Sequence, residues 1–413
     1  MLIIQTSDLH LGVATYGEID ASTGLSKRID DYFKCLDFIM EYAISNKADF
    51  FLICGDAFNN PVPTPTILKM FASRLKKLTK TGIAVVMIAG NHDLPKTEGR
   101  VSPIEIYSEI GMDNFYYLSG PTYIDLRTKD KKKVRIFAVP YVHPIKTFNK
   151  QQNLKKEKKE LTYEAVLKAY GEEYADCISK FSKIGKGDAD YCILMSHIAV
   201  FGTSRGTEEP ITLLGGEFAL LPNVLHSDIF DYVALGHIHK HQCLEWKVPI
   251  IYSGSIEKSN FSEIDEKKGF VAVQVGNKLE WKFIELPTRK MVKIEVDATG
   301  IRNIREKIYE ELRRVDIKDA IVKLIIKVSK KSRPNFDYSD IRRMMAGAFY
   351  VEPSYERVQE DLPTQMLFSE ALSANDSLIR YLETLKNLSK KERSLLEKLG
   401  LEIIKEVEDE ATE

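Results

Sequence analysis

The chain has 413 residues, of which 44% are hydrophobic and 29% are charged, as is usual for folded globular proteins. Lysine and arginine (59) balance aspartate and glutamate (60), so the formal net charge of −1 excludes a wholly polybasic binder but leaves room for a local basic face. No apolar run approaches the roughly 18–20 residues that span a bilayer. The first residues (MLIIQTSDLH) lack a basic leader, and the scattered cysteines form no paired motif, so we expect a cytoplasmic protein of two or three domains.

The first 285 residues alternate short apolar runs with amphipathic stretches, which predicts an α/β fold. The runs are rich in Ile, Val, Phe and Tyr and stop at Gly, Ser, Asp or Asn, as buried strands do. Residues 28–44 and 65–78 carry apolar side chains at helical spacing and are predicted helices. The predicted strands lie at residues 2–4, 50–54, 84–89, 134–140, 191–195 and 232–235.

The later part of this region contains an insertion and a closing hairpin. Residues 146–190 are predicted to be mostly helical, and their basic run at 155–159 is most simply a solvated helix face. Apolar runs at 249–253, 270–275 and 279–286 predict a late antiparallel hairpin.

A second, smaller domain is predicted after the linker-like residues 286–290. Residues 290–351 follow a β-α-β-α-β pattern and carry 15 Lys and Arg against 9 Asp and Glu. Such a local surplus of positive charge is typical of a surface that faces nucleic acid. Residues 352–374 contain two prolines and little periodicity, which predicts a linker, and residues 375–413 predict a pair of amphipathic helices.

Polar residues of kinds that bind metals follow five of the predicted strands. D-x-H follows the first, Gly-Asp the second and Gly-Asn-His-Asp the third, while a single His and then G-H-x-H follow two later ones. Strand ends of an α/β sheet are where ligands bind, so we expect one shared site. The residues concerned are Asp8, His10, Asp56, Asn91, His92, Asp93, His197, His237 and His239.

The mixture of side chains indicates the metal class. Imidazoles combined with carboxylates and an amide oxygen favour divalent Mn, Fe or Zn over Mg or Ca, which prefer oxygen ligands alone. One ion uses about four to six ligands, so this many candidates predicts two ions. The glycines at positions 55, 90 and 236 permit the tight turns that such loops need. D-x-H or Gly-Asp alone is weak evidence, and Gly-Asn-His-Asp after a strand is already specific. All of the motifs in this order favour a single metal centre.

This order of motifs resembles the calcineurin-like metallophosphoesterases. The spacing over residues 1–285, the LPTR linker, the cap and the C-terminal helices are similar to one branch, the SbcD-type nucleases of DNA double-strand break repair. The resemblance implies an α/β fold with a four-layer-type β-sandwich flanked by helices. It also implies a small α+β cap domain and C-terminal helices.

The resemblance further implies a ligand set for two Mn²⁺ ions, with other divalent metals as alternatives. Asp56 would bridge the two ions. The remaining ligands of the first ion would be Asp8, His10 and His239. Those of the second ion would be Asn91, His197 and His237.

Two further residues would act without binding metal. His92 is similar to the family's catalytic histidine that faces the scissile phosphate, and Asp93 would orient His92 through a hydrogen bond. One position departs from the family pattern, because Asn59 stands where relatives often have a histidine. Its amide can hydrogen-bond a phosphate but cannot carry a proton.

The implied activity is Mn-dependent hydrolysis of double-stranded DNA ends, as a 3'-5' exonuclease and an endonuclease. The basic cap would hold the duplex backbone, and the helix pair at 375–413 would dock an SbcC-type, SMC-like ABC ATPase. Segments near 65–80 and 101–111 correspond to where relatives dimerise, so we expect a homodimer that does not bind membranes.

Other classes are less well supported. A small-molecule phosphodiesterase or pyrophosphatase of the same superfamily would use the same motifs, but it would not need a basic cap or a tethered helix pair. A protein phosphatase is disfavoured because its family has Arg after the GD and GNH motifs, where this chain has Ala57 and Asp93. A non-catalytic scaffold would have lost ligands, and here all the implied ligands are present.

Overall fold

The computed structural model describes residues 1–95, 100–155, 160–203, 218–244, 247–276, 278–301, 303–329, 338–358 and 390–410, with residues 375, 378, 379 and 382. The chain divides into two compact units. The larger comprises Met1–Ile294, Tyr309–Leu324 and Tyr338–Pro353. The smaller comprises Glu295–Ile308, Ile325–Asp337 and Ser354–Glu413. Within the described ranges, the structure contains no helix with the length and apolarity needed to cross a membrane.

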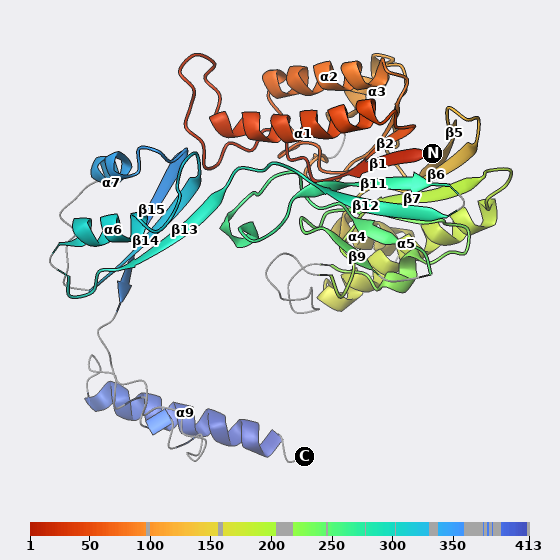
Figure 1. The fold of residues 1–413 in the computed structure, drawn as a ribbon. Helices are drawn as coiled ribbons and strands as arrows, with labels where there is room; N and C mark the ends of the chain where they lie inside the picture. Colours follow the sequence, from red (N-terminus) through yellow and green to blue (C-terminus); the bar gives the residue numbers. More distant parts are fainter. Residues whose placement is uncertain are drawn as a thin grey trace. The chain divides into compact units, whose positions relative to one another are not determined.

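The larger unit contains a six-stranded sheet with the order β12-β11-β1-β2-β3-β4. Figure 1 labels β1, β2, β11 and β12 of this sheet. Strands β1 to β4 are parallel to one another, β11 pairs antiparallel with β1, and β12 pairs antiparallel with β11. The predicted pairing of runs 270–275 and 279–286 is therefore confirmed. The strands are β1 (Leu2–Thr6), β2 (Phe50–Cys54), β3 (Ala84–Ile88), β4 (Phe115–Tyr117), β11 (Gly269–Val275) and β12 (Leu279–Glu285).

A second six-stranded sheet has the order β5-β6-β7-β8-β10-β9. The run at 249–253, predicted to join the late hairpin, forms β10 in this sheet and lies parallel to β8, so that part of the prediction is wrong. An apolar run that is buried on both faces carries no pattern that identifies its neighbour. The strands are β5 (Thr122–Arg127), β6 (Lys133–Val139), β7 (Tyr191–His197), β8 (Tyr232–Gly236), β9 (Gln242–Leu244) and β10 (Ile250–Tyr252).

The two sheets pack face to face, and helices cover their outer faces. In β2, Phe50 and Leu52 lie in the core between the sheets, whereas Phe51 and Ile53 pack towards the helices. Alternation of this kind is what a strand buried on both faces requires. Helices α1 (Lys27–Ser45), α2 (Pro65–Thr79) and α3 (Glu105–Glu109) contribute to the core on the outer face of the first sheet. Helix α5 (Tyr163–Ile184) covers the second sheet, and α4 (Pro144–Lys155) packs beside it.

This arrangement confirms the predicted four-layer sandwich. The predicted helices 28–44 and 65–78 correspond to α1 and α2, which begin after Ser26 and Thr64, whose hydroxyls accept backbone N–H groups. The predicted helical insertion corresponds to α4 and α5. Its basic run at 155–159 lies almost entirely outside the described residues.

The basic segment forms strands and helices in the predicted β-α-β-α-β order, and its sheet has the order β13-β14-β15. The third strand continues past residue 352, into the predicted linker, and contains Pro353. Because this strand lies at the edge of the sheet, a residue without an N–H is tolerated there. The elements are β13 (Met291–Asp297), α6 (Ile304–Leu312), β14 (Ile321–Ser329), α7 (Tyr338–Met344) and β15 (Tyr350–Val358).

The C-terminal region is described only in part. The second predicted helix is α9 (Lys390–Glu410). Most of the first predicted helix lies outside the described residues, although residues 375, 378, 379 and 382 are helical. Most of the predicted linker also lies outside them.

One buried polar side chain connects the two sheets. Gln5 of β1 is fully buried, and its Nε2 donates to the carbonyl oxygens of Leu235 (3.1 Å) and Ile251 (2.9 Å). Its Oε1 accepts a hydrogen bond from the Tyr232 hydroxyl. All three partners belong to the second sheet, so this amide fixes how the sheets, and the loops that follow them, are aligned.

We predict that Gln5→Met lowers the free energy of unfolding by roughly 2–4 kcal/mol, because it removes three buried hydrogen bonds, two to backbone carbonyls and one from the Tyr232 hydroxyl. Gln274→Met, the same change at an exposed position of β11, should leave stability almost unchanged. Urea unfolding followed by circular dichroism measures both. Equal stability of the two variants would show that Gln5 does not hold the sheets together.

Candidate metal centre and active site

The loops that follow β1, β2, β3 and β8, together with His197 at the end of β7, bring all the predicted site residues to one edge of the sandwich. The first two loops are joined by backbone hydrogen bonds, because the Asp8 N–H donates to Gly55 O (3.0 Å) and the His10 N–H donates to Asp56 O (3.0 Å). Asp8, His10 and Asp56 have φ angles of 51°, 41° and 52°. This left-handed conformation costs a non-glycine residue of the order of 1–3 kcal/mol, and it turns the side chains towards one point.

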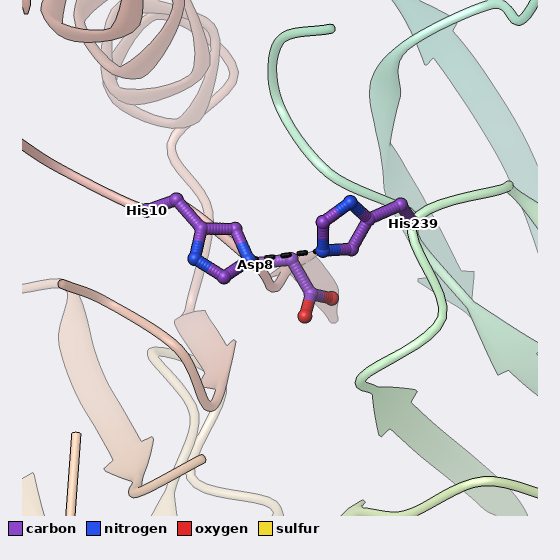
Figure 2. Close-up of side chains that lie close together, drawn as sticks. All are labelled: Asp8, His10 and His239. Carbon is purple, nitrogen blue, oxygen red and sulfur yellow. Dashed lines mark hydrogen bonds between the residues drawn. The ribbon is translucent and has the colours of Figure 1, made fainter. Parts of the chain in front are cut away.

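The first group contains Asp8 and His10, from the loop after β1, and His239, from the loop after β8 (Figure 2). Their candidate ligand atoms lie within 4.8 Å of one another. The Nε2 atoms of His10 and His239 face each other at 2.9 Å. Ser7 Oγ and the backbone N–H of His237 donate to the Asp8 carboxylate and hold it in place.

The second group contains Asp56, Asn91, His197 and His237. Asn91 Oδ1 lies 3.1 Å from His197 Nε2 and 3.0 Å from His237 Nδ1. Asp56 Oδ2 lies 3.4 Å from His197 Nε2 and 3.8 Å from His10 Nε2, so this one carboxylate contacts both groups. The residues predicted to bind each ion are thus adjacent, and Asp56 lies between them.

The donor set fits a cation. His197 Nδ1 lies 2.8 Å from the Cys54 carbonyl oxygen, and because a carbonyl only accepts, Nδ1 carries the proton. A neutral His197 therefore directs its Nε2 lone pair at the oxygens of Asp56 and Asn91. Three electron-rich atoms so arranged need a positive charge among them, and imidazole nitrogen with carboxylate oxygen suits divalent Mn, Fe or Zn.

The pKa values of the histidines also indicate that positive charge is stabilised beside Asp56. Burial disfavours a charged His197, but the Asp56 carboxylate outweighs it and raises the pKa of His197 to about 9. In the metal-free protein a proton thus compensates the Asp56 charge. Burial also lowers the pKa of His10 to about 4 and that of His237 to about 3, which leaves both imidazoles neutral and able to bind a metal.

His92 lies at the solvent-exposed side of the centre. Its Nδ1 lies 2.9 Å from the backbone carbonyl oxygen of Asn59, which again places the proton on Nδ1. Its backbone N–H donates to Asp56 Oδ1 (2.7 Å). A ring nitrogen of His92 lies within 4.8 Å of ligand atoms of His10 and Asp56. The Asn59 side chain is not needed for this contact, so the departure from the family histidine leaves it intact.

Asp93 does not orient His92, and our prediction of that hydrogen bond is wrong. The Asp93 carboxylate is fully buried and accepts from the N–H groups of Ala57 (3.2 Å), Phe58 (3.0 Å) and Gly90 (3.0 Å). Burial and the nearby Asp56 charge raise the pKa of Asp93 to about 7. Asp93 therefore connects two loops of the site, and the Asn59 carbonyl orients His92.

All three predicted glycines are required by close approach, since a Cβ at Gly236 would lie 2.0 Å from the Cys54 carbonyl oxygen. A Cβ at Gly55 would lie 2.2 Å from His197 Nδ1, and a Cβ at Gly90 would lie 2.2 Å from Asp56 Oδ1. Either side chain would displace a predicted ligand.

Sequence reasoning missed the acceptors that hold the histidine rings. The Cys54 and Asn59 carbonyls and the Glu263 carboxylate contact His197, His92 and His239, respectively. Every residue has a backbone carbonyl, so the sequence does not indicate which carbonyls accept from the histidines. Glu263 follows β10 in a short 3₁₀ helix, η2 (Phe261–Glu263), where no motif indicates it.

We predict that Mn²⁺ raises the melting temperature of the parent protein. At a hundredfold excess over the dissociation constant, binding at one site adds about 2.7 kcal/mol to the free energy of unfolding. Asp8→Ala should lose most of this increase because it removes one oxygen donor. Asp37→Ala, which removes a surface carboxylate paired with Arg74, should keep it. Differential scanning fluorimetry with and without Mn²⁺ tests this, and an undiminished increase in Asp8→Ala would exclude Asp8 as a ligand.

Comparison with known proteins agrees with this geometry. Residues 1–241 match the family model described as calcineurin-like phosphoesterase. The chain is 24% identical over 408 residues to the DNA double-strand break repair protein Mre11 of Archaeoglobus fulgidus, covering 94% of this chain and 81% of that protein. It is 26% identical over 321 residues to a component of the nuclease SbcCD of Staphylococcus epidermidis, covering 75% of this chain and 76% of the relative.

A solved dimetal phosphatase from Danio rerio aligns with 69% of this chain and 96% of its own, with 9% identity and a TM-score of 0.41. A likeness this weak carries no argument about activity. The sequence relatives confirm the predicted resemblance to the SbcD-type branch, and the family model confirms the prediction of a metal-dependent phosphoesterase. The chain belongs to the calcineurin-like phosphoesterases.

Proposed function

We propose that this protein is a metal-dependent DNA nuclease that acts in double-strand break repair. The observation that carries the proposal is the pair of ligand groups that share Asp56, with His92 at their exposed side. The names of the relatives, a break-repair protein and a nuclease component, support DNA as the substrate. Mn²⁺, two ions and combined 3'-5' exonuclease and endonuclease activity are the finer parts of the proposal.

The ligand assignment follows the two groups. Asp8, His10 and His239 would hold one ion and Asn91, His197 and His237 the other, with Asp56 shared. When bound, such ions lower the pKa of water and neutralise the charge of a phosphodiester. The loops would keep the ligands fixed, since their backbones and carboxylates are already held by hydrogen bonds.

His92 would supply the proton-transfer chemistry. Its Nδ1–H is engaged by the Asn59 carbonyl, so Nε2 is the nitrogen left for the substrate. A protonated Nε2 would donate a hydrogen bond to a phosphate oxygen and a proton to the leaving oxygen. General acid catalysis of this kind contributes about 10²–10⁴-fold to a rate.

We predict that His92→Asn reduces DNA cleavage by at least about 10²-fold while Mn²⁺ binding persists, because the variant loses a proton donor and no ligand. His226→Asn, the same change in a half-exposed histidine beside Asp228, should cleave at the parent rate. Initial cleavage rates and calorimetric Mn²⁺ titration of each variant give the comparison. An unchanged rate in His92→Asn would contradict the proton-transfer role.

The substrate class has its own test, which also separates the small-molecule alternative. We expect the protein to degrade end-labelled duplex DNA with Mn²⁺ and to be inactive with EDTA, since the ligand groups need a cation. Mg²⁺ and a chromogenic phosphodiester are tested in parallel. Turnover of the small ester without any loss of DNA would favour a small-molecule phosphodiesterase or pyrophosphatase instead.

The other parts of the chain receive proposed roles. Residues 1–285 would form the nuclease domain and residues 290–351 a DNA-capping domain, supported by the surplus of Lys and Arg there. The linker would begin after Val358, where β15 ends, rather than at residue 352. Cytoplasmic localisation stays a prediction.

Two exposed apolar surfaces support the partner predictions. We propose that the helix pair at 375–413 docks an SMC-like ABC ATPase of the SbcC type, because α9 exposes an apolar row. That row consists of Leu395, Leu396, Leu399 and Ile403. We propose a homodimer through the α2–α3 region, which also exposes apolar side chains. These are Val62, Val101, Ile106 and Ile110.

A further inference from the structure

A buried ionic cluster lies directly behind one of the proposed metal ligands. It consists of Glu263, Glu266 and Lys268, whose exposed fractions are 3%, 8% and 1%. Burying three ionisable side chains this deeply lowers the stability of the fold unless their charges are paired and hydrogen-bonded. None of them belongs to the motifs that identify the family in this sequence.

Glu263 contacts the imidazole of His239. Its Oε1 lies 2.9 Å from His239 Nδ1, and its Oε2 accepts from the Ser259 N–H (2.9 Å). Because a carboxylate only accepts, the His239 proton lies on Nδ1 and the lone pair lies on Nε2. That Nε2 is the atom facing His10 Nε2 in the first ligand group.

Lys268 holds the same glutamate and the same histidine. Its Nζ lies 3.0 Å from Glu263 Oε2 and donates to the backbone carbonyl oxygen of His239 (3.1 Å). The main chain and the ring of His239 are therefore both held by this glutamate–lysine pair. Burial opposes ionisation of Glu263, but the hydrogen bond from His239 and the charge of Lys268 outweigh it and lower the pKa of Glu263 to about 2.

His239 needs such support more than His197 does. The His197 side chain is fully buried and donates to the Cys54 carbonyl, whereas 27% of the His239 side chain is exposed. Packing alone would let the partly exposed ring rotate or adopt the other tautomer, which places a proton on Nε2 and prevents ligation. A carboxylate hydrogen-bonded to the far nitrogen of a ligating histidine prevents both changes.

We propose that Glu263, held by Lys268, is a positioning residue that fixes the ring orientation and tautomer of His239 for metal binding. The inference rests on the proposed metal function of the site and adds a residue that none of the motifs contains. Glu263 does not bind the metal itself. It acts through His239, so its removal should weaken binding at the first ligand group only.

The test compares two buried glutamates of one segment. Glu263→Met removes the acceptor at His239 and should weaken binding of Mn²⁺ to one site by about 10–100-fold. Glu257→Met is the matched control, because Glu257 is fully buried and paired with Arg28 (3.3 Å) but lies outside both ligand groups. Both variants should melt at a lower temperature, and only Glu263→Met should lose affinity. Isothermal titration of the metal-free proteins with Mn²⁺ measures it.

A milder variant keeps the test decisive if Glu263→Met does not fold. Glu263→Gln retains an oxygen that can accept from Nδ1–H but removes the charge, so its affinity should lie between those of the parent and Glu263→Met. Affinities within twofold of the parent in both Glu263 variants would overturn the proposal. An equal loss in Glu257→Met would also overturn it, because it would indicate a general structural effect.

The result for Glu263 can be distinguished from the result for the nuclease proposal, because metal binding and DNA cleavage are measured separately. A parent protein that binds Mn²⁺ yet leaves duplex DNA intact would contradict the nuclease function and leave the positioning role of Glu263 to be decided by titration. If the parent cleaves DNA while Glu263→Met binds Mn²⁺ with parent affinity, the nuclease function is supported and the positioning role of Glu263 is contradicted.

Discussion

The site depends on two buried carboxylates, Asp8 and Asp56, that have 0% and 2% of their surface exposed. Negative charge at that depth is tolerated only with compensation, and no lysine or arginine contacts either carboxylate among the ion pairs of the described residues. Imidazoles and backbone N–H groups approach them instead. Positive charge at this point therefore stabilises the site, as a proton on His197 in the metal-free protein and as a divalent cation in the proposed metal-bound protein. Strained backbone angles and glycines that admit no Cβ follow from packing so many polar groups around one point.

A second theme is how the histidines are oriented. In His92, His197 and His239 the Nδ1 atom faces a fixed acceptor, which is a backbone carbonyl in two cases and Glu263 in the third. Each acceptor places the proton on Nδ1 and leaves Nε2 for the metal or the substrate. The acceptors are fixed in turn by the strands and loops, so the tautomers are a consequence of the fold. The alignment of the two sheets also matters for the site, because its loops follow strands of both sheets. The amide of Gln5 connects these sheets through hydrogen bonds.

Much of this can be predicted from sequence because the relevant patterns are local. Buried strands and amphipathic helices have characteristic periods, and the metal-binding residues follow strands at short, recognisable spacings. The predictions that fail are those that depend on distant parts of the chain. Pattern alone places the run of β10 in the wrong sheet, and the family resemblance pairs Asp93 with His92. In space, Asp93 binds three backbone N–H groups, and a carbonyl from another loop takes its predicted place.

By itself the sequence determined the family, the fold class and the residues available to bind metal, because each depends on residue types at fixed spacing along the chain. Only the tertiary structure decided which nitrogen carries the proton in His92, His197 and His239, which acceptors hold their rings, and that Glu263 lies behind His239. These features depend on contacts between segments that are far apart in sequence, and on backbone carbonyls that every residue possesses. Residue identity contains no record of either, so they become visible only when the chain is folded.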